Sequence, residues 1–123
     1  MQEHKVEAGL QQLRRSVAIW QEFSDAYYLL GTVALKKQAW EDALNYFQAM
    51  QKISPQDLQA REGIALIELG KGMHLHIEGK LPQALEHFEK YIIMTPHESE
   101  RQTVKKRVQN LRETIGKEKG EKQ

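Results

Sequence analysis

The stretch that decides the fold is SDAYYLLGTVALKKQAWEDALNYFQAMQKISPQD, which runs from Ser24 to Asp57. It places small residues at Gly31 and Ala43 among large apolar and aromatic ones, and no proline interrupts it before Pro55. Small residues let two helices approach closely, and the large residues around them fill the contact. The stretch therefore predicts a hairpin of two antiparallel helices.

The motif within this stretch has the spacing Tyr27-x2-Leu30-Gly31, then Ala43-x3-Phe47, then Pro55. This spacing resembles the tetratricopeptide repeat (TPR) family, whose unit is a 34-residue pair of helices. Two positions depart from the family pattern: Ala34 stands where an aromatic is usual, and Met50 where a small residue is usual. The resemblance implies an all-α chain of stacked hairpins, a fragment of a TPR-type solenoid.

Composition limits the classes of protein to consider. The 123 residues suffice for a single domain, expected over residues 1–117, and the net charge of +1 gives no long-range attraction to nucleic acid or membrane. The absence of cysteine excludes disulfides and thiolate metal sites. The N-terminus is charged and no apolar run reaches about 18 residues. We expect a cytoplasmic protein, although a longer parent chain could carry an export or membrane segment.

Before the central hairpin, residues 5–21 carry apolar side chains at spacings of three and four, which predicts one amphipathic helix. This helix resembles the second helix of a repeat whose first helix is absent, so its flank has no covering neighbour. Such a flank could pair with a second copy of the chain, which makes homo-oligomeric assembly the alternative function. The residues expected at that contact are Val6, Leu13, Trp20 and Phe23.

The central repeat, residues 24–57, is expected to hold helices at about Asp25–Lys37 and Glu41–Ile53, with Ser24 as an N-cap candidate. A second repeat spans residues 58–96, because Ala84-x3-Phe88 and then Pro96 copy the central motif 41 residues later.

The excess over 34 residues is seven, close to two helical turns, so we expect an elongated first helix at Leu58–Glu78, with MHLHIEG (73–79) as the insertion. Gly70 and Gly72 leave a kink or break in this helix open.

The remaining chain predicts a helix at Pro82–Ile93 and a C-terminal cap helix over residues 97–116, for about six helices in all. Thr95 and Glu98 have the spacing of a capping box. The cap helix carries a single narrow apolar seam, as expected of an element with one face in water. The tail, residues 117–123, has no apolar residue and is expected to be disordered.

Catalytic and metal chemistry find little support. His74 and His76 lie two apart, so a helix points their rings to opposite sides and they share a metal only if the helix breaks. The sequence contains no G-x-S-x-G motif and no phosphate-binding glycine loop. We therefore expect no enzyme activity, no metal site and no cofactor.

Nucleic-acid binding through the cap helix is a remote alternative. Its basic residues are diluted by Glu98, Glu100 and Glu113, and no aromatic side chain is available for stacking on bases. We expect no nucleic-acid partner. The basic residues are Arg101, Lys105, Lys106, Arg107 and Arg112.

Binding of another protein is the function that remains, as an adaptor or scaffold. The resemblance implies a concave groove, lined by the first helix of each hairpin, that binds a peptide or a helix of the partner. Family members that bind chaperone tails hold a carboxylate with lysine and asparagine, but the matching positions here are Tyr28, Thr32, Glu62 and Gly63, which disfavours that ligand. Leu66 and Leu69 could instead pack on a neighbouring helix. The groove residues implied are Asp25, Tyr28, Thr32, Leu35, Lys36, Gln59, Glu62, Leu66, Leu69 and Met73.

Overall fold

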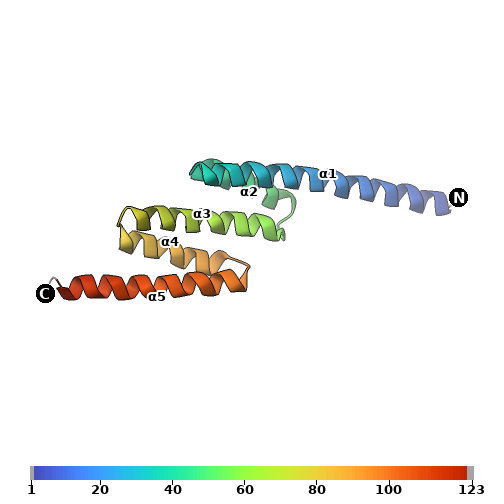
Figure 1. The fold of residues 1–123 in the computed structure, drawn as a ribbon. Coiled ribbons are helices and arrows are strands. Elements are labelled where there is room, and N and C mark those ends of the chain that lie inside the picture. Colours follow the sequence, from blue (N-terminus) through green and yellow to red (C-terminus); the bar gives the residue numbers. More distant parts are fainter. Residues whose placement is uncertain (1, 122–123) are drawn as a thin grey trace.

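The computed structural model describes residues 2–121, with the side chains of residues 2–7, 13, 17 and 121 left undescribed. This part of the chain is entirely helical apart from its turns, which confirms the all-α class. The helices lie side by side as antiparallel neighbours, and the N-terminal part of α1 extends beyond the others (Figure 1). There are five of them in the described range, so the prediction of about six is wrong: α1 (Gln2–Lys36), α2 (Trp40–Ile53), α3 (Leu58–Ile77), α4 (Leu81–Met94) and α5 (Glu98–Glu121).

The two helices expected on either side of Ser24 form one continuous helix, α1. Ser24 is buried at 3% exposure inside the helix and does not cap it. The Asp25 carboxylate accepts a hydrogen bond of 2.9 Å from Gln21, one turn earlier in the same helix. No proline or glycine lies between Gly9 and Gly31 to stop the helix. The helix boundary predicted at Ser24 is therefore wrong, because this possible N-cap residue is buried within a continuous helix.

The aromatic ring of Phe47 joins three helices. A Cβ atom at Gly31 of α1 or at Gly63 of α3 would lie 2.5 Å from a ring carbon of Phe47, so only glycine leaves room for the ring. Phe47 is fully buried between these two backbones. α2 is thereby packed against both α1 and α3.

The second hairpin repeats this arrangement 41 residues later. A Cβ atom at Gly72 of α3 would lie 2.8 Å from the ring of Phe88, as one at Gly31 would lie against the ring of Phe47. The turn after each first helix has one residue with a positive φ, Gln38 at 60° and Gly79 at 80°. These equivalences place the extra turns at the start of α3, and not at residues 73–79 as the sequence suggested.

α3 is one unbroken helix in spite of its glycines. Gly70 accommodates the indole ring of Trp40, which would lie 2.7 Å from a Cβ there, so this glycine serves packing. The helix is capped by the Asp57 carboxylate, which accepts a 2.9 Å bond from the amide of Ala60. Ser54 lies before this cap and ends α2.

The core consists of two clusters, one around Phe47 and one around Phe88. α5 closes the second cluster with Val104, Val108 and Leu111, which are buried against α4. α5 continues past Gly116 to Glu121, so residues 117–121 are helical where the sequence predicted disorder; residues 122 and 123 lie outside the described range. Lys and Glu favour helix in this segment without the need for burial.

The Phe47 slot yields a stability prediction. Gly31→Ala should lower the free energy of unfolding by about 1–3 kcal/mol, because the new methyl group overlaps the ring. Gly116→Ala is the matched control: it also lies in a helix, but nothing is within 4 Å of its Cβ position, so it should stabilise by up to about 1 kcal/mol. Urea unfolding of the two variants measures both values, and a Gly31→Ala protein as stable as wild type would contradict the slot.

Candidate functional site

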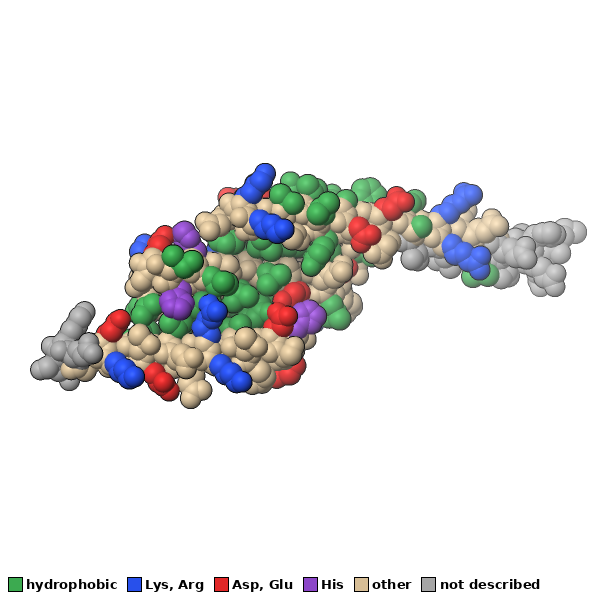
Figure 2. All heavy atoms as spheres, in the orientation of Figure 1, with side chains coloured by type: hydrophobic (Ala, Val, Ile, Leu, Met, Phe, Trp, Pro, Cys, Tyr) green, Lys and Arg blue, Asp and Glu red, His purple; other side chains and the backbone are tan. Residues whose placement is uncertain are grey.

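The candidate site is a groove between α3 and α5, here called the α3–α5 groove. No Cα atoms of α3 and α5 lie within 8 Å of each other, so the two helices flank an open space of about 350 Å³. Hydrophobic side chains gather in the middle of this face, between α1 and α5 (Figure 2). The residues that line the groove are Leu69 and Met73 of α3, Tyr91 of α4, and Ser99, Glu100, Thr103, Val104 and Arg107 of α5.

The floor of the groove is held by a buried polar cluster. Thr95 donates a 2.7 Å hydrogen bond to the Glu62 carboxylate, and the Tyr91 hydroxyl lies 3.1 Å from the other oxygen of the same carboxylate. The Tyr91 hydroxyl is also 3.3 Å from Glu100 and donates its single proton to one carboxylate at a time. This cluster ties the start of α3 to the end of α4.

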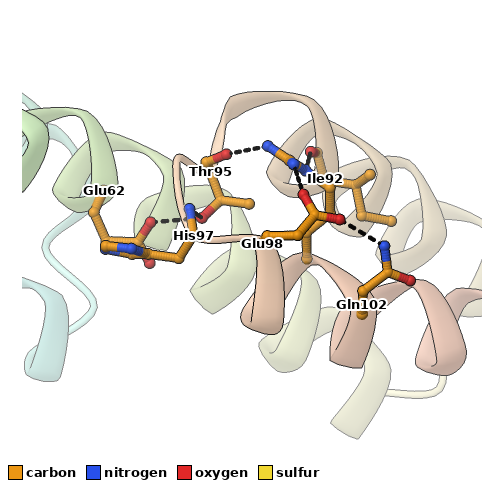
Figure 3. Close-up of polar contacts among 7 residues, drawn as sticks. Glu62, Ile92, Thr95, His97, Glu98 and Gln102 are labelled. Carbon is orange, nitrogen blue, oxygen red and sulfur yellow. Dashed lines mark hydrogen bonds and ion pairs between the residues drawn. The ribbon is translucent and has the colours of Figure 1, made fainter.

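The turn from α4 to α5 is fixed by hydrogen bonds around Arg101. Its side chain donates to the carbonyls of Ile92 at 2.9 Å and Thr95 at 2.5 Å, and it pairs with Glu98 (Figure 3). These bonds satisfy carbonyls at the C-terminal end of α4. They set the angle at which α5 leaves α4 and hence the opening of the groove.

The predicted capping box at this turn forms only in part. The Thr95 hydroxyl accepts a 3.2 Å bond from the amide of His97 (Figure 3). Glu98 accepts a 2.7 Å bond from Gln102 and pairs with Arg101, and these partners lower the pKa of its carboxyl group. Glu98 therefore serves α5 and not Thr95.

The rim of the groove carries opposite charges at its two ends. Glu100 lies beside Tyr91, and Arg107 lies two turns further along α5 with its guanidinium carbon 5.7 Å from the centre of the Phe88 ring. The described residues place no carboxylate in ion-pair contact with Arg107. The ring and the α5 backbone thus orient a cation whose charge is available to a ligand.

Two of the predicted groove residues of α3 line the α3–α5 groove, and the other three do not. Leu69 and Met73 line the α3–α5 groove, and Met73 is 42% exposed. Leu66 packs against the second core cluster, and Gln59 is exposed near the start of the helix. Glu62 is only 8% exposed and binds the hydroxyls of the buried cluster, so its carboxylate is not presented to a ligand as the sequence suggested.

The predicted groove residues of α1 do not join this groove. Tyr28 and Leu35 are half-buried against the Phe47 cluster, and the Tyr28 ring centre lies 6.3 Å from that of Phe47. The Thr32 hydroxyl donates to the Tyr28 carbonyl at 2.7 Å. Asp25 and Lys36 are exposed. Truncating Tyr28 or Leu35 would therefore remove core packing, and these positions are unsuited to testing a groove.

The sequence did not lead us to predict that Tyr91 and residues of α5 line the groove, because we treated α5 only as a terminal helix with one face in water. A signal was present, since Thr103 and Arg107 follow the predicted groove residues Glu62 and Leu66 by 41 residues, the same offset that relates Phe47 to Phe88. The residues missed are Tyr91, Ser99, Glu100, Thr103, Val104 and Arg107.

The residues predicted for self-association are not equivalent in the structure. Trp20 is half-buried and packs against the Phe47 cluster, whereas Phe23 is 53% exposed. The rings of Phe23 and Tyr27 stack with centres 6.4 Å apart. The side chains of Val6 and Leu13 lie outside the described residues.

The histidines have separate surroundings. His74 lies 2.6 Å from Glu78, His87 lies 2.6 Å from Glu68, and His76 packs edge-on to Phe88. In the part of the chain that is described, no three histidine, aspartate or glutamate side chains gather as metal ligands would. The hypothesis of a His74 and His76 site therefore gains no support.

The basic residues of α5 do not form one free surface. Arg101 pairs with Glu98, Arg112 pairs with Glu89 of α4, and Arg107 lies over Phe88. Lys105 and Lys106 are exposed. A continuous cationic stripe, which a nucleic-acid backbone needs, is interrupted by these ion pairs.

Comparison of the chain with protein-family models, with curated proteins and with solved structures gave no match. Within residues 2–121, no helix combines the length and the apolar character needed to cross a membrane.

The buried cluster predicts a pH dependence. Burial, with the Glu62 and Glu100 carboxylates nearby, raises the pKa of Tyr91 to about 12, against a lowering contribution from the Thr95 hydroxyl. The folded protein therefore holds this proton more tightly than the unfolded chain, whose tyrosine titrates near pH 10. The stabilisation is complete below pH 10 and is lost as the pH rises toward 12.

An ultraviolet titration of phenolate should accordingly show one of the four tyrosines ionising late, and Tyr91→Phe should remove that late step. At neutral pH the same variant should lose about 1–3 kcal/mol of stability, because the buried Glu62 carboxylate loses a donor. Four tyrosines that titrate together in the folded wild type would contradict the burial of Tyr91.

Proposed function

We propose that the chain is a protein-interaction module of the TPR type, which binds a peptide segment of a partner protein in the α3–α5 groove and acts as an adaptor or scaffold. The observation that carries this proposal is the groove itself, an open and mainly apolar surface between two helices whose Cα atoms stay more than 8 Å apart. An apolar surface with a polar rim suits an apolar ligand segment. The proposal includes no chemical reaction.

The family assignment draws its support from the packing of the hairpins. In both hairpins a phenylalanine of the second helix fits against a glycine of the first, Phe47 against Gly31 and Phe88 against Gly72. Gly31, Phe47 and Phe88 belong to the sequence motif that resembles the family, and Gly72 stands 41 residues after Gly31. The shared period of 41 residues, longer than the usual 34, is the main departure.

The charges at the rim specify the ligand further. Glu100 and Arg107 are seven residues apart on α5, a rise of about 10 Å. An extended chain covers that distance in about three residues. We therefore propose a ligand with a basic side chain near Glu100, an acidic side chain near Arg107, and an apolar side chain between them over Met73 and Val104.

Selection from a random peptide library on the immobilised protein tests this function. Selected peptides should combine an apolar residue with opposite charges about three positions apart. Met73→Glu should weaken their binding about tenfold or more, which corresponds to about 1.4 kcal/mol. The control is Ile77→Glu, one turn further along α3, where the side chain is 86% exposed and does not line the groove.

A charge exchange sharpens the test. Arg107→Glu should weaken the binding of the selected peptides. Replacing the acidic residue of the peptide with lysine should restore binding to this variant. Peptides that bind wild type, Met73→Glu and Ile77→Glu equally well would reject the groove as the binding site. A library that yields no binding peptide would reject the proposed function.

A further inference from the structure

α1 carries an exposed apolar stripe, none of whose residues lines the α3–α5 groove. Five of its six members recur at spacings of four and three residues, and Leu29 lies beside them, so all six lie on one side of the helix. All six are exposed, with Phe23 at 53% and Leu29 at 64%. We call this surface the α1 stripe, and its residues are Ile19, Phe23, Ala26, Leu29, Leu30 and Val33.

The internal repeat shows that the corresponding face is covered in the second hairpin. The α3 residues 41 positions after Ile19 and Ala26 are Ala60 and Ile67, which are buried in the cluster with Phe47 of α2. The same side of a first helix is therefore a packing surface there. On α1, which contacts α2 and α3 through other residues, it is open.

A helix like α2 cannot cover the α1 stripe in the same way. α3 receives the rings of Phe47 and Trp40 over Gly63 and Gly70. The α1 residues 41 positions earlier are Glu22 and Leu29, whose side chains occupy the space that the glycines leave open. The stripe is therefore a row of projecting side chains, and an occupant packs against these side chains and cannot place a ring against the α1 backbone as Phe47 and Trp40 do on α3.

The opposite end of the molecule does not complement the stripe. On α3, Ala65 and Gly72 face α4, but their counterparts on α5 are Lys106 and Glu113, which are both exposed. A head-to-tail contact between copies would bury an apolar stripe against these charges. A contact that uses the same face of both copies avoids this, because apolar residues meet apolar residues.

We propose that the α1 stripe binds the α1 stripe of a second copy of this chain, which makes the protein a two-fold symmetric dimer. The two helices pair antiparallel, because a parallel pair would set Glu22 of one copy against Glu22 of the other, whereas an antiparallel pair separates these two carboxylates. Ala26 lies at the two-fold axis, where its small side chain lets the backbones approach.

In this register Phe23 of each copy lies opposite Leu29 of the other, Ile19 lies opposite Val33, and only Leu30 among the stripe residues lies opposite a charged residue, Glu22. Ile19, Ala26 and Val33 are seven residues apart, which is the repeat that keeps one seam in contact along two helices. The contact leaves the α3–α5 groove of each copy open. Dimerisation does not depend on the peptide-binding function proposed above.

Sedimentation equilibrium at submillimolar protein concentration tests this dimer. Wild type should have twice the mass of the chain, and both Phe23→Glu and Leu29→Glu should have the mass of one chain. Ile93→Glu is the control, since Ile93 is 81% exposed on α4 and should leave the dimer intact. A wild type that is monomeric at this concentration would overturn the proposal, as would a dimer that survives in both stripe variants.

The absence of cysteine permits a second measurement. Ala26→Cys places one thiol near the two-fold axis of the proposed dimer and should give a disulfide-linked pair under mild oxidation. Asn45→Cys, exposed on α2, should not link under the same conditions. Equal linking of the two variants would contradict the position of Ala26 at the two-fold axis.

Discussion

The contact of the Phe47 ring with two glycines is the constraint on which the arrangement of the helices depends. The ring lies between Gly31 of α1 and Gly63 of α3, at positions where a Cβ atom would be 2.5 Å away. It therefore sets how closely α1, α2 and α3 approach one another. Phe88 repeats the contact against Gly72, so the second hairpin follows the geometry of the first. The groove and the α1 stripe are the surfaces that this packing leaves uncovered.

Polar contacts fix the angle of α5, which the apolar packing alone does not determine. α5 joins the stack through one row of apolar side chains on α4, and such a row alone specifies the helix angle poorly. Glu62 and Arg101 supply the missing specificity, since each bonds several groups of the α4 end and the turn that follows. A carboxylate on the inner face of α3 thus has a structural role, and the charges available to a ligand are those of α5.

How much the sequence could predict follows from how local each feature is. The bounds of α2 and α4 and the pairing of Phe47 with a small residue rest on motifs within a few turns, and these were predictable. The burial of Ser24 was not predictable, because it depends on contacts between α1 and its neighbours. The partners of Glu62 lie 29 and 33 residues away in the chain, beyond any local pattern. The α5 residues that line the groove could have been predicted from the 41-residue offset between the repeats.

The central claim is that one aromatic ring lies against the backbones of two helices, and nuclear magnetic resonance tests it most directly. The Hα protons of Gly31 and Gly63 should both show upfield ring-current shifts and nuclear Overhauser contacts with the Phe47 ring. Both shifts should disappear in Phe47→Leu, while Gly9 and Gly116, which have no neighbouring ring, should stay unchanged. Ordinary shifts for either Gly31 or Gly63 in the wild-type protein would contradict the account.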